Sequence, residues 1–161
     1  MALKVGDRAP DFSLPAVEGE QRSEFRLADY RGKQNVVVTF HPLDWTPTCE
    51  SQLPILDSLH TKFEEAGGKL LDISVDSIPS KIAWQKKEIG MMQTPLCADF
   101  YPHGKVSQQF DVFRDVPPYP GICERAVFIV DKAGKIAFAK VYPLDQAPSN
   151  QELLDALKNI G

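Results

Sequence analysis

A cysteine at the expected start of a helix is the feature of this sequence that points most directly to chemistry. Cys49 follows the segment 40–48 (FHPLDWTPT), in which Pro47 suits the first turn of a helix. The unpaired backbone N–H groups and the positive end of the helix dipole favour an anion there, and the thiolate is the nucleophilic form of cysteine. Cys49 is therefore the candidate nucleophile, against the competing interpretation of a small apolar residue packed at a helix end.

Three other residues have types and positions that suit chemistry at Cys49. Thr46 is near enough in sequence to donate its hydroxyl group to the sulfur or to a bound oxygen, and Pro42 can shield the site from water. A cysteine that reacts as a thiolate also needs a fixed cation nearby, for which Arg125 is the best candidate because it stands at the entrance to an apolar segment. The competing interpretation is an arginine that caps the sheet edge or pairs with Glu124.

The elements that must position these residues are expected to form one α/β domain over residues 1–161. Residues 36–40 (VVVTF) have the pattern of a central strand buried on both faces, and apolar residues at helical spacing over 47–66 predict a helix that Pro54 kinks. The other expected elements are a hairpin turning at Gly19-Glu20, a polar connector at 23–30, strands at 69–75, 94–98, 126–130 and 135–141, and helices at 79–90, 104–110 and 149–160.

The order of these elements favours a thioredoxin-like fold. Alternating strands and helices imply right-handed parallel crossovers, and the turn residues 131–134 (DKAG) predict an antiparallel hairpin late in the chain. We therefore expect a central mixed sheet flanked by helices, with the N-terminal hairpin as an extension.

Composition and charge argue against several classes of partner. The 161 residues include 18 basic and 22 acidic side chains, for a formal net charge of -4, and no basic block suits a phosphate backbone, so no nucleic-acid partner is expected. No run approaches the roughly 18 apolar residues that span a bilayer, and the start of the sequence lacks an apolar signal region, which predicts no membrane partner and a cytoplasmic location. Three cysteines are an odd number at low density, which suits a reducing compartment rather than a disulfide-stapled scaffold.

On these residues the sequence resembles the peroxiredoxin family, the alkyl hydroperoxide reductase and thiol-specific antioxidant group. The signature of that family is Pro-x-x-x-Thr-x-x-Cys after a central strand, and Pro42, Thr46 and Cys49 fill it. The resemblance continues at residues 5–12 (VGDRAPDF) and 125–131 (RAVFIVD), so it covers nearly the whole chain.

The resemblance implies a thiol peroxidase that reduces hydrogen peroxide, organic hydroperoxides or both, without a cofactor or a metal. It implies that Cys49 is the peroxidatic thiolate, that Thr46 and Arg125 orient the peroxide oxygens, that Pro42 shields the sulfur and that Gln52 holds Arg125. The attack leaves a sulfenic acid on Cys49, which a thiol must then reduce. By the same analogy the protein is expected to be a homodimer, with exposed aromatic residues such as Trp45, Trp84 or Tyr119 available for an interface.

The sequence departs from the family pattern at two places. The position before Pro42 is commonly aromatic in the family and here is His41, which we interpret as the replacement of one ring by another rather than as a residue that tunes the site. The sequence ends at Gly161, without the C-terminal extension that carries the resolving cysteine of typical two-cysteine members, so that mechanism is expected to be excluded.

The thiol that reduces the sulfenic acid is left open by the sequence. Cys123 lies two residues before Arg125, and if the strand has already begun there both side chains point to one face of the sheet, near Cys49. We favour Cys123 as an internal resolving cysteine, with Cys97 as a second possibility although its apolar context is typical of a core residue. A one-cysteine cycle with a thioredoxin-like protein or a low-molecular-weight thiol as reductant is the alternative.

Three other functions compete with the peroxidase interpretation. A thiol-disulfide oxidoreductase normally needs a Cys-x-x-Cys pair, and position 46 holds a threonine instead. A structural or chaperone protein would carry Cys49 only incidentally. A metal-binding or redox-sensing module would use residues whose separations do not match compact zinc-site spacings, namely Cys49, Cys97, Cys123, His41, His60 and His103.

Overall fold

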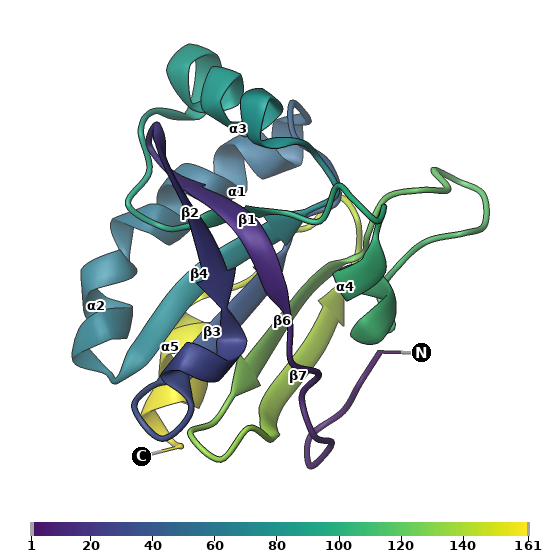
Figure 1. The fold of residues 1–161 in the computed structure, drawn as a ribbon. Helices are drawn as coiled ribbons and strands as arrows, with labels where there is room; N and C mark the ends of the chain where they lie inside the picture. Colours follow the sequence, from purple (N-terminus) through teal and green to yellow (C-terminus); the bar gives the residue numbers. More distant parts are fainter. Residues whose placement is uncertain (1, 161) are drawn as a thin grey trace.

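A seven-stranded mixed sheet organises the computed structural model, which describes residues 2–160 (Figure 1). The strand order is β2-β1-β5-β4-β3-β6-β7. The strands are β1 (Ser13–Glu18), β2 (Gln21–Arg26), β3 (Asn35–Phe40), β4 (Gly68–Ser74), β5 (Leu96–Ala98), β6 (Arg125–Val130) and β7 (Ile136–Tyr142). The helices are α1 (Pro47–Ser58), α2 (His60–Glu65), α3 (Ile78–Trp84), α4 (Lys105–Gln109) and α5 (Asn150–Lys158), with a 3-10 turn at Leu27–Tyr30 and a π-helical turn at Gln85–Ile89.

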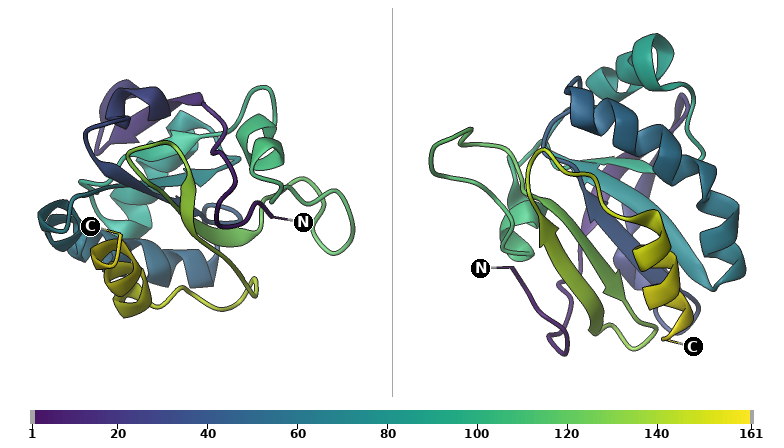
Figure 2. Two further views of the ribbon diagram at one scale, coloured as in Figure 1. Left: turned by 90° about the horizontal axis from the view of Figure 1, so that it is seen from below. Right: turned by 180° about the vertical axis from the view of Figure 1, so that it is seen from behind.

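The three inner strands β3, β4 and β5 are parallel, and the strands outside them pair antiparallel. The parallel pairs are joined by α1 with α2 and by α3, as the alternation of elements predicts. Helices α1, α2 and α5 cover one face of the sheet, whereas α4 and the N-terminal segment lie on the other (Figures 1 and 2). The expected central mixed sheet flanked by helices, with an N-terminal hairpin, is confirmed.

Strand β3 is the element on which the site depends, because the loop that carries Cys49 leaves its end. All six of its residues are buried, and it pairs with β4 on one side and β6 on the other. Side chains alternate between two core layers. Val36, Val38 and Phe40 belong to one apolar cluster, and Val37 belongs to a second on the helix-covered face.

Two of the expected element boundaries are wrong. The helix expected over 47–66 is divided at Leu59, whose backbone (φ -99°, ψ 5°) leaves the helical region, while α1 continues through Pro54. The segment 23–30 is not a connector, because β2 extends to Arg26 and the 3-10 turn follows it directly. Strand β2 looks polar in sequence because it is an edge strand with mostly exposed side chains.

Within residues 2–160, no helix combines the length and the apolar character needed to cross a bilayer.

Candidate active site

Cys49 lies in the first turn of α1, directly after the loop that leaves β3. Pro47 begins the helix, and the N-cap residue Thr46 has an extended backbone and makes no side-chain cap bond. The Cys49 side chain is completely buried. Trp45 has a left-handed backbone (φ 71°), which is unusual for a residue other than glycine and indicates a tightly constrained loop.

Arg125 is the first residue of β6 and reaches the sulfur of Cys49 from the neighbouring strand. Its Nη2 lies 3.4 Å from Cys49 Sγ and donates to the carbonyl of Leu144 at 2.8 Å, and its Nε donates to the same carbonyl at 3.2 Å. Its Nη1 donates to Oε1 of Gln52, one turn along α1 from the cysteine. The expected set of Cys49, Arg125 and Gln52 is therefore brought together.

The alternative pairing of Arg125 with Glu124 is wrong. Glu124 accepts both of its side-chain bonds from Arg114, at 3.0 Å. Arg125 is buried, and among the described residues it has no carboxylate partner, so its positive charge faces only neutral oxygen atoms and the sulfur of Cys49. The amide Nε2 of Gln52 is also buried and has no hydrogen-bond partner among those residues.

An open cavity of about 340 Å³ lies over this site. Pro42, Thr46 and Arg125 form part of its lining, as the sequence predicts for residues that meet a substrate. The Thr46 hydroxyl donates to the carbonyl of Leu43 at 2.9 Å instead of to the sulfur, so its lone pairs stay available as acceptors. The rest of the lining is largely apolar and consists of Leu43, Pro47, Thr48, Tyr119, Ile122, Leu144 and Asp145.

Cys123 does not share a face of the sheet with Arg125, because the strand begins only at Arg125. Cys123 instead forms an isolated β-bridge with Phe113 and packs in the apolar cluster that contains Ala126 and Phe128. Arg125 precedes Ala126 in the strand, so its side chain points to the opposite face of the sheet. Its Sγ donates to the carbonyl of His41 at 3.1 Å. Burial raises the pKa of the Cys123 thiol well above its ordinary value, which opposes the nucleophilic thiolate.

Cys97 lies in β5 as a core residue, as its sequence context predicts. It is completely buried, and burial raises the pKa of its thiol. All three cysteines are free thiols in this structure.

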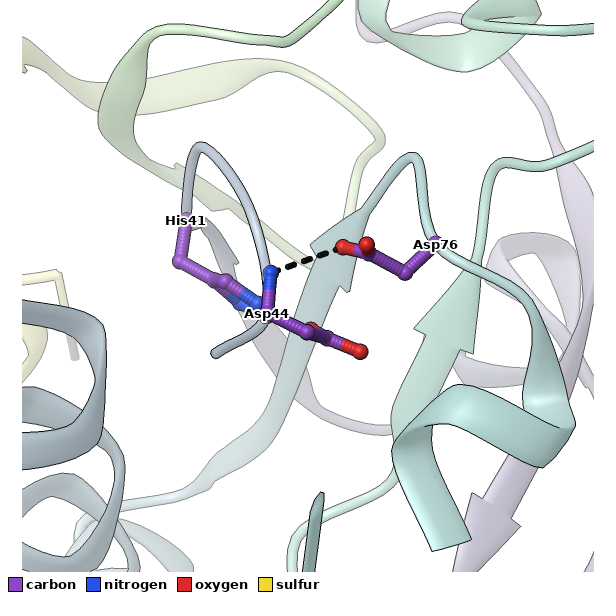
Figure 3. Close-up of side chains that lie close together, drawn as sticks. All are labelled: His41, Asp44 and Asp76. Carbon is purple, nitrogen blue, oxygen red and sulfur yellow. Dashed lines mark hydrogen bonds and ion pairs between the residues drawn. The ribbon is translucent and has the colours of Figure 1, made fainter. Parts of the chain in front are cut away.

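Behind the active-site loop lies a second, entirely buried group of polar side chains that we call the inner cluster. It consists of Thr39, His41, Asp44, Asp72, Ser74 and Lys81, which come from β3, the loop, β4 and α3. The partly buried Asp76 borders it and accepts the backbone N–H of Asp44 at 2.9 Å (Figure 3). His41 therefore does more than replace one aromatic ring by another, although its ring does pack 5.3 Å from that of Trp84.

The hydrogen bonds of the inner cluster join acids to cations. Both ring nitrogens of His41 contact carboxylates, Nδ1 that of Asp72 and Nε2 that of Asp44 at 2.6 Å. Lys81 Nζ lies 3.4 Å from Asp44 and hydrogen-bonds to the hydroxyl of Ser74. Burial opposes the charged form of His41, but the Asp72 carboxylate and the hydrogen bonds to both acids outweigh it and raise the pKa of His41 to about 10. Burial likewise opposes the charged form of Asp44, yet Lys81 and then His41 hold the pKa of Asp44 well below its usual range.

The inner cluster is already charge-compensated and does not fit a metal ion. His41, Asp44 and Asp76 place ligand atoms within 4.8 Å of one another. However, neither ring nitrogen of His41 has a free lone pair when both donate to carboxylates, and the ammonium of Lys81 occupies the position of a cation beside Asp44. Metal binding there would require loss of a proton and displacement of a lysine.

Sequence reasoning missed Asp44, Asp72 and Lys81. The available signal was an acidic residue inside the otherwise apolar strand segment 68–74 (GKLLDIS), because a buried charge needs a partner. Trp84, which we expected as an interface residue, is completely buried, whereas Trp45 and Tyr119 are exposed.

Comparison with known proteins gives consistent matches over almost the whole chain. The AhpC/TSA family matches residues 5–139. Alkyl hydroperoxide reductase E of Mycobacterium tuberculosis is 35% identical, covering 96% of this chain and 96% of its own length, and the chloroplastic 2-Cys peroxiredoxin BAS1 of Hordeum vulgare is 34% identical over 96% of this chain and 73% of its own. The structure of reduced 2-Cys peroxiredoxin from Plasmodium vivax superposes with a TM-score of 0.91 at 30% identity, covering 98% of this chain and 82% of the other.

Proposed function

Because the chain belongs to the AhpC/TSA family and is a thiol-dependent peroxidase with a thioredoxin-like fold, we propose that Cys49 is its peroxidatic nucleophile and that the cavity above it receives the hydroperoxide. The observation that carries this assignment is the 3.4 Å contact between Arg125 Nη2 and Cys49 Sγ at a helix start. A guanidinium without a carboxylate partner stabilises both the thiolate and the charge that develops on the peroxide.

The proposed reaction transfers one oxygen atom to sulfur. The Cys49 thiolate attacks the terminal oxygen of the hydroperoxide, an S–O bond forms while the O–O bond breaks, and the alkoxide or hydroxide that leaves takes a proton from water. Cys49 becomes a sulfenic acid. Thr46, whose own proton is donated to Leu43, accepts the hydrogen bond of the peroxide O–H group, while Arg125 donates to the leaving oxygen.

The lining of the cavity supports a substrate with an apolar group. Leu43, Pro47, Ile122 and Leu144 surround the approach to Arg125, and a hydrocarbon placed against them loses contact with water. Hydrogen peroxide gains nothing from these walls. We therefore propose that organic hydroperoxides react faster than hydrogen peroxide.

An external thiol is the proposed reductant of the Cys49 sulfenic acid. The buried position of Cys123, its bond to the His41 carbonyl and its raised thiol pKa all weigh against rapid internal attack, and Cys97 is equally buried. A low-molecular-weight thiol would enter through the open cavity, whereas a thioredoxin-like protein would have to present its thiol at the mouth of the cavity. The homodimer, the cytoplasmic location and the extent of the domain over residues 1–161 stay predictions of the sequence, and Met1 and Gly161 lie outside the described residues.

The experiment that tests this proposal is oxidation of the reduced protein with one equivalent of cumene hydroperoxide, followed by intact-mass and peptide analysis. We expect a sulfenic acid on Cys49 in the wild type and in Cys97→Ser and Cys123→Ser, and no peroxide consumption by Cys49→Ser. A disulfide from Cys49 to Cys123 or Cys97 would overturn the external reductant. Full peroxide consumption by a folded Cys49→Ser would overturn the nucleophile.

A further inference from the structure

The loop between α4 and β6 projects from the body of the molecule and carries an exposed aromatic residue that faces the active-site cavity (Figures 1 and 2). This residue, Tyr119, is 66% exposed, yet it lines the same cavity as Thr46 and Arg125. The proposed reaction assigns a role to Thr46 and Arg125 and none to Tyr119. A side chain that is open to solvent and also part of the cavity wall is placed to meet a substrate.

The backbone of Tyr119 gives no reason for a tyrosine at this position. Its φ is 63°, in the left-handed region that residues with a Cβ atom adopt at a cost in free energy, and that glycine or asparagine adopts more easily. The flanking residues Pro118 and Pro120 already restrict the chain. A bulky residue held in this conformation beside a reactive site indicates that its side chain contributes something other than loop formation.

The side chain of Arg114 fixes the part of the loop that carries Tyr119. Its Nε and Nη2 donate to the carbonyl of Pro118, the residue before Tyr119, at 3.1 and 2.8 Å. Its Nη1 donates to both carboxylate oxygens of Glu124 at 3.0 Å. Because Glu124 directly precedes Arg125, the same guanidinium ties the loop to the strand that positions the active-site arginine.

Further hydrogen bonds close the base of the same loop. The backbone N–H of Arg114 donates to the carbonyl of Ile122 at 2.8 Å, and the N–H of Gly121 donates to the carbonyl of Arg114 at 2.7 Å. The ring Nε2 of His103 donates to the carbonyl of Gly121 at 2.6 Å. A side chain on a loop that is already fixed loses little conformational freedom when a ligand binds, so Tyr119 is preorganised for contact.

The exposure of the lining residues indicates how deep each of them lies in the cavity. Arg125 is buried, and Ile122 and Leu144 are partly buried. The peroxide oxygens must reach Arg125, so a small alkyl group ends against the partly buried residues, whereas a larger group extends to the exposed Tyr119. The ring of Tyr119 favours a second ring there, because offset or edge-to-face contact between rings adds to the burial of apolar area.

We propose that Tyr119 is a specificity-determining residue at the mouth of the cavity, and that it selects organic hydroperoxides whose hydrocarbon group carries an aromatic ring. This inference rests on the proposed function, since it requires that the hydroperoxide reacts with Cys49 in this cavity. The ring of Tyr119 packs against the ring of the substrate, while Ile122 and Leu144 contact the carbon atoms next to the peroxide group. Tyr119 takes no part in the transfer of oxygen to sulfur.

The test compares cumene hydroperoxide with tert-butyl hydroperoxide, which has a methyl group in place of the phenyl group. Reduced protein is mixed with each peroxide without a reductant, quenched after short times and analysed by mass spectrometry for sulfenic acid on Cys49. We expect the wild type to react faster with cumene hydroperoxide. In Tyr119→Asn, which suits the left-handed backbone, we expect the ratio of the two rate constants to fall about 10-fold, without a loss in the free energy of unfolding.

Two matched variants separate the ring from the loop. Tyr119→Phe keeps the ring and should keep the wild-type ratio. Val116→Ala should also keep it, because Val116 is exposed in the same loop and is not one of the described residues that line the cavity.

An unchanged ratio in Tyr119→Asn, or an equal fall in Val116→Ala, would overturn the proposal. If the ratio stays unchanged while the oligomeric state shifts in sedimentation, the ring of Tyr119 belongs to an interface between subunits instead. Oxidation of a residue other than Cys49 would overturn the proposed function, so the two failures are distinguishable.

Discussion

Arg125 and Lys81 are buried cations on the two sides of the loop between β3 and α1, and their partners differ in kind. Arg125 binds a backbone carbonyl, an amide oxygen and the Cys49 sulfur, without a carboxylate among the described residues. Lys81 lies beside the carboxylate of Asp44, within a cluster whose acids and cations balance. The positive charge of Arg125 is therefore available to an anionic sulfur or oxygen, whereas the positive charge of Lys81 is already paired with a buried carboxylate.

The largest effect is expected on stability, when a buried cation is removed from the inner cluster. Lys81→Met leaves Asp44 buried with only His41 as a charged partner, and we expect a loss of about 3–5 kcal/mol in the free energy of unfolding, measured in urea. Lys86→Met is the control, because Lys86 pairs with Glu20 on the surface at 2.9 Å and its loss should change stability by less than about 1 kcal/mol. Similar losses in the two variants would contradict the view of Lys81 as a compensating buried charge.

Removal of the Arg125 side chain should lower the rate of the reaction more than the stability of the fold. Arg125→Leu is expected to lower kcat/KM for cumene hydroperoxide by about 100-fold or more, because the developing charge loses its preorganised donor. Arg26→Leu removes an exposed arginine that pairs with Glu24 and should leave kcat/KM unchanged. A folded Arg125→Leu enzyme with wild-type kcat/KM would remove Arg125 from the mechanism.

The inner cluster should also make the free energy of unfolding depend on pH. In the folded protein the pKa of His41 is raised from 6.5 to about 10. Between these two pH values the folded protein keeps a proton on His41 that the unfolded chain has released. The stabilisation is therefore complete below pH 6.5 and is lost as the pH rises to about 10. We expect the free energy of unfolding of the wild type to fall over this range more steeply than that of His41→Phe/Asp72→Leu. Parallel curves would show that His41 is not protonated in the folded state.

The smallest effect is expected from the apolar wall of the cavity. Ile122→Ala and Leu144→Ala each remove methyl groups from the lining, and we expect kcat/KM for cumene hydroperoxide to fall about 5-fold relative to kcat/KM for hydrogen peroxide. Val141→Ala, an exposed position on β7, serves as the control. An equal change for both peroxides would argue against a hydrocarbon subsite.

The sequence determined the parts of this protein that depend on neighbours along the chain. An apolar strand, a short loop and a helix that starts at a proline are local features, so the position of Cys49 at the head of α1 could be predicted from residues 36–49. The alternation of strands and helices likewise determined the parallel inner strands, and the turn residues 131–134 determined the antiparallel hairpin of β6 and β7. The partnership of Arg125 with Gln52 came from the family resemblance and agrees with the structure.

The tertiary structure alone decided which side chains meet across the sheet. Cys123 and Arg125 are two residues apart, yet they face different layers because β6 begins at Arg125, and a boundary shift of this kind reverses the direction of a side chain. The inner cluster joins side chains from β3, β4, α3 and the loop, and its hydrogen-bonded pairs include Lys81 and Asp44, which are 37 residues apart in sequence. A histidine, an aspartate or a lysine carries no local sign of its partner, because such a partnership depends on the distance and the burial that folding creates.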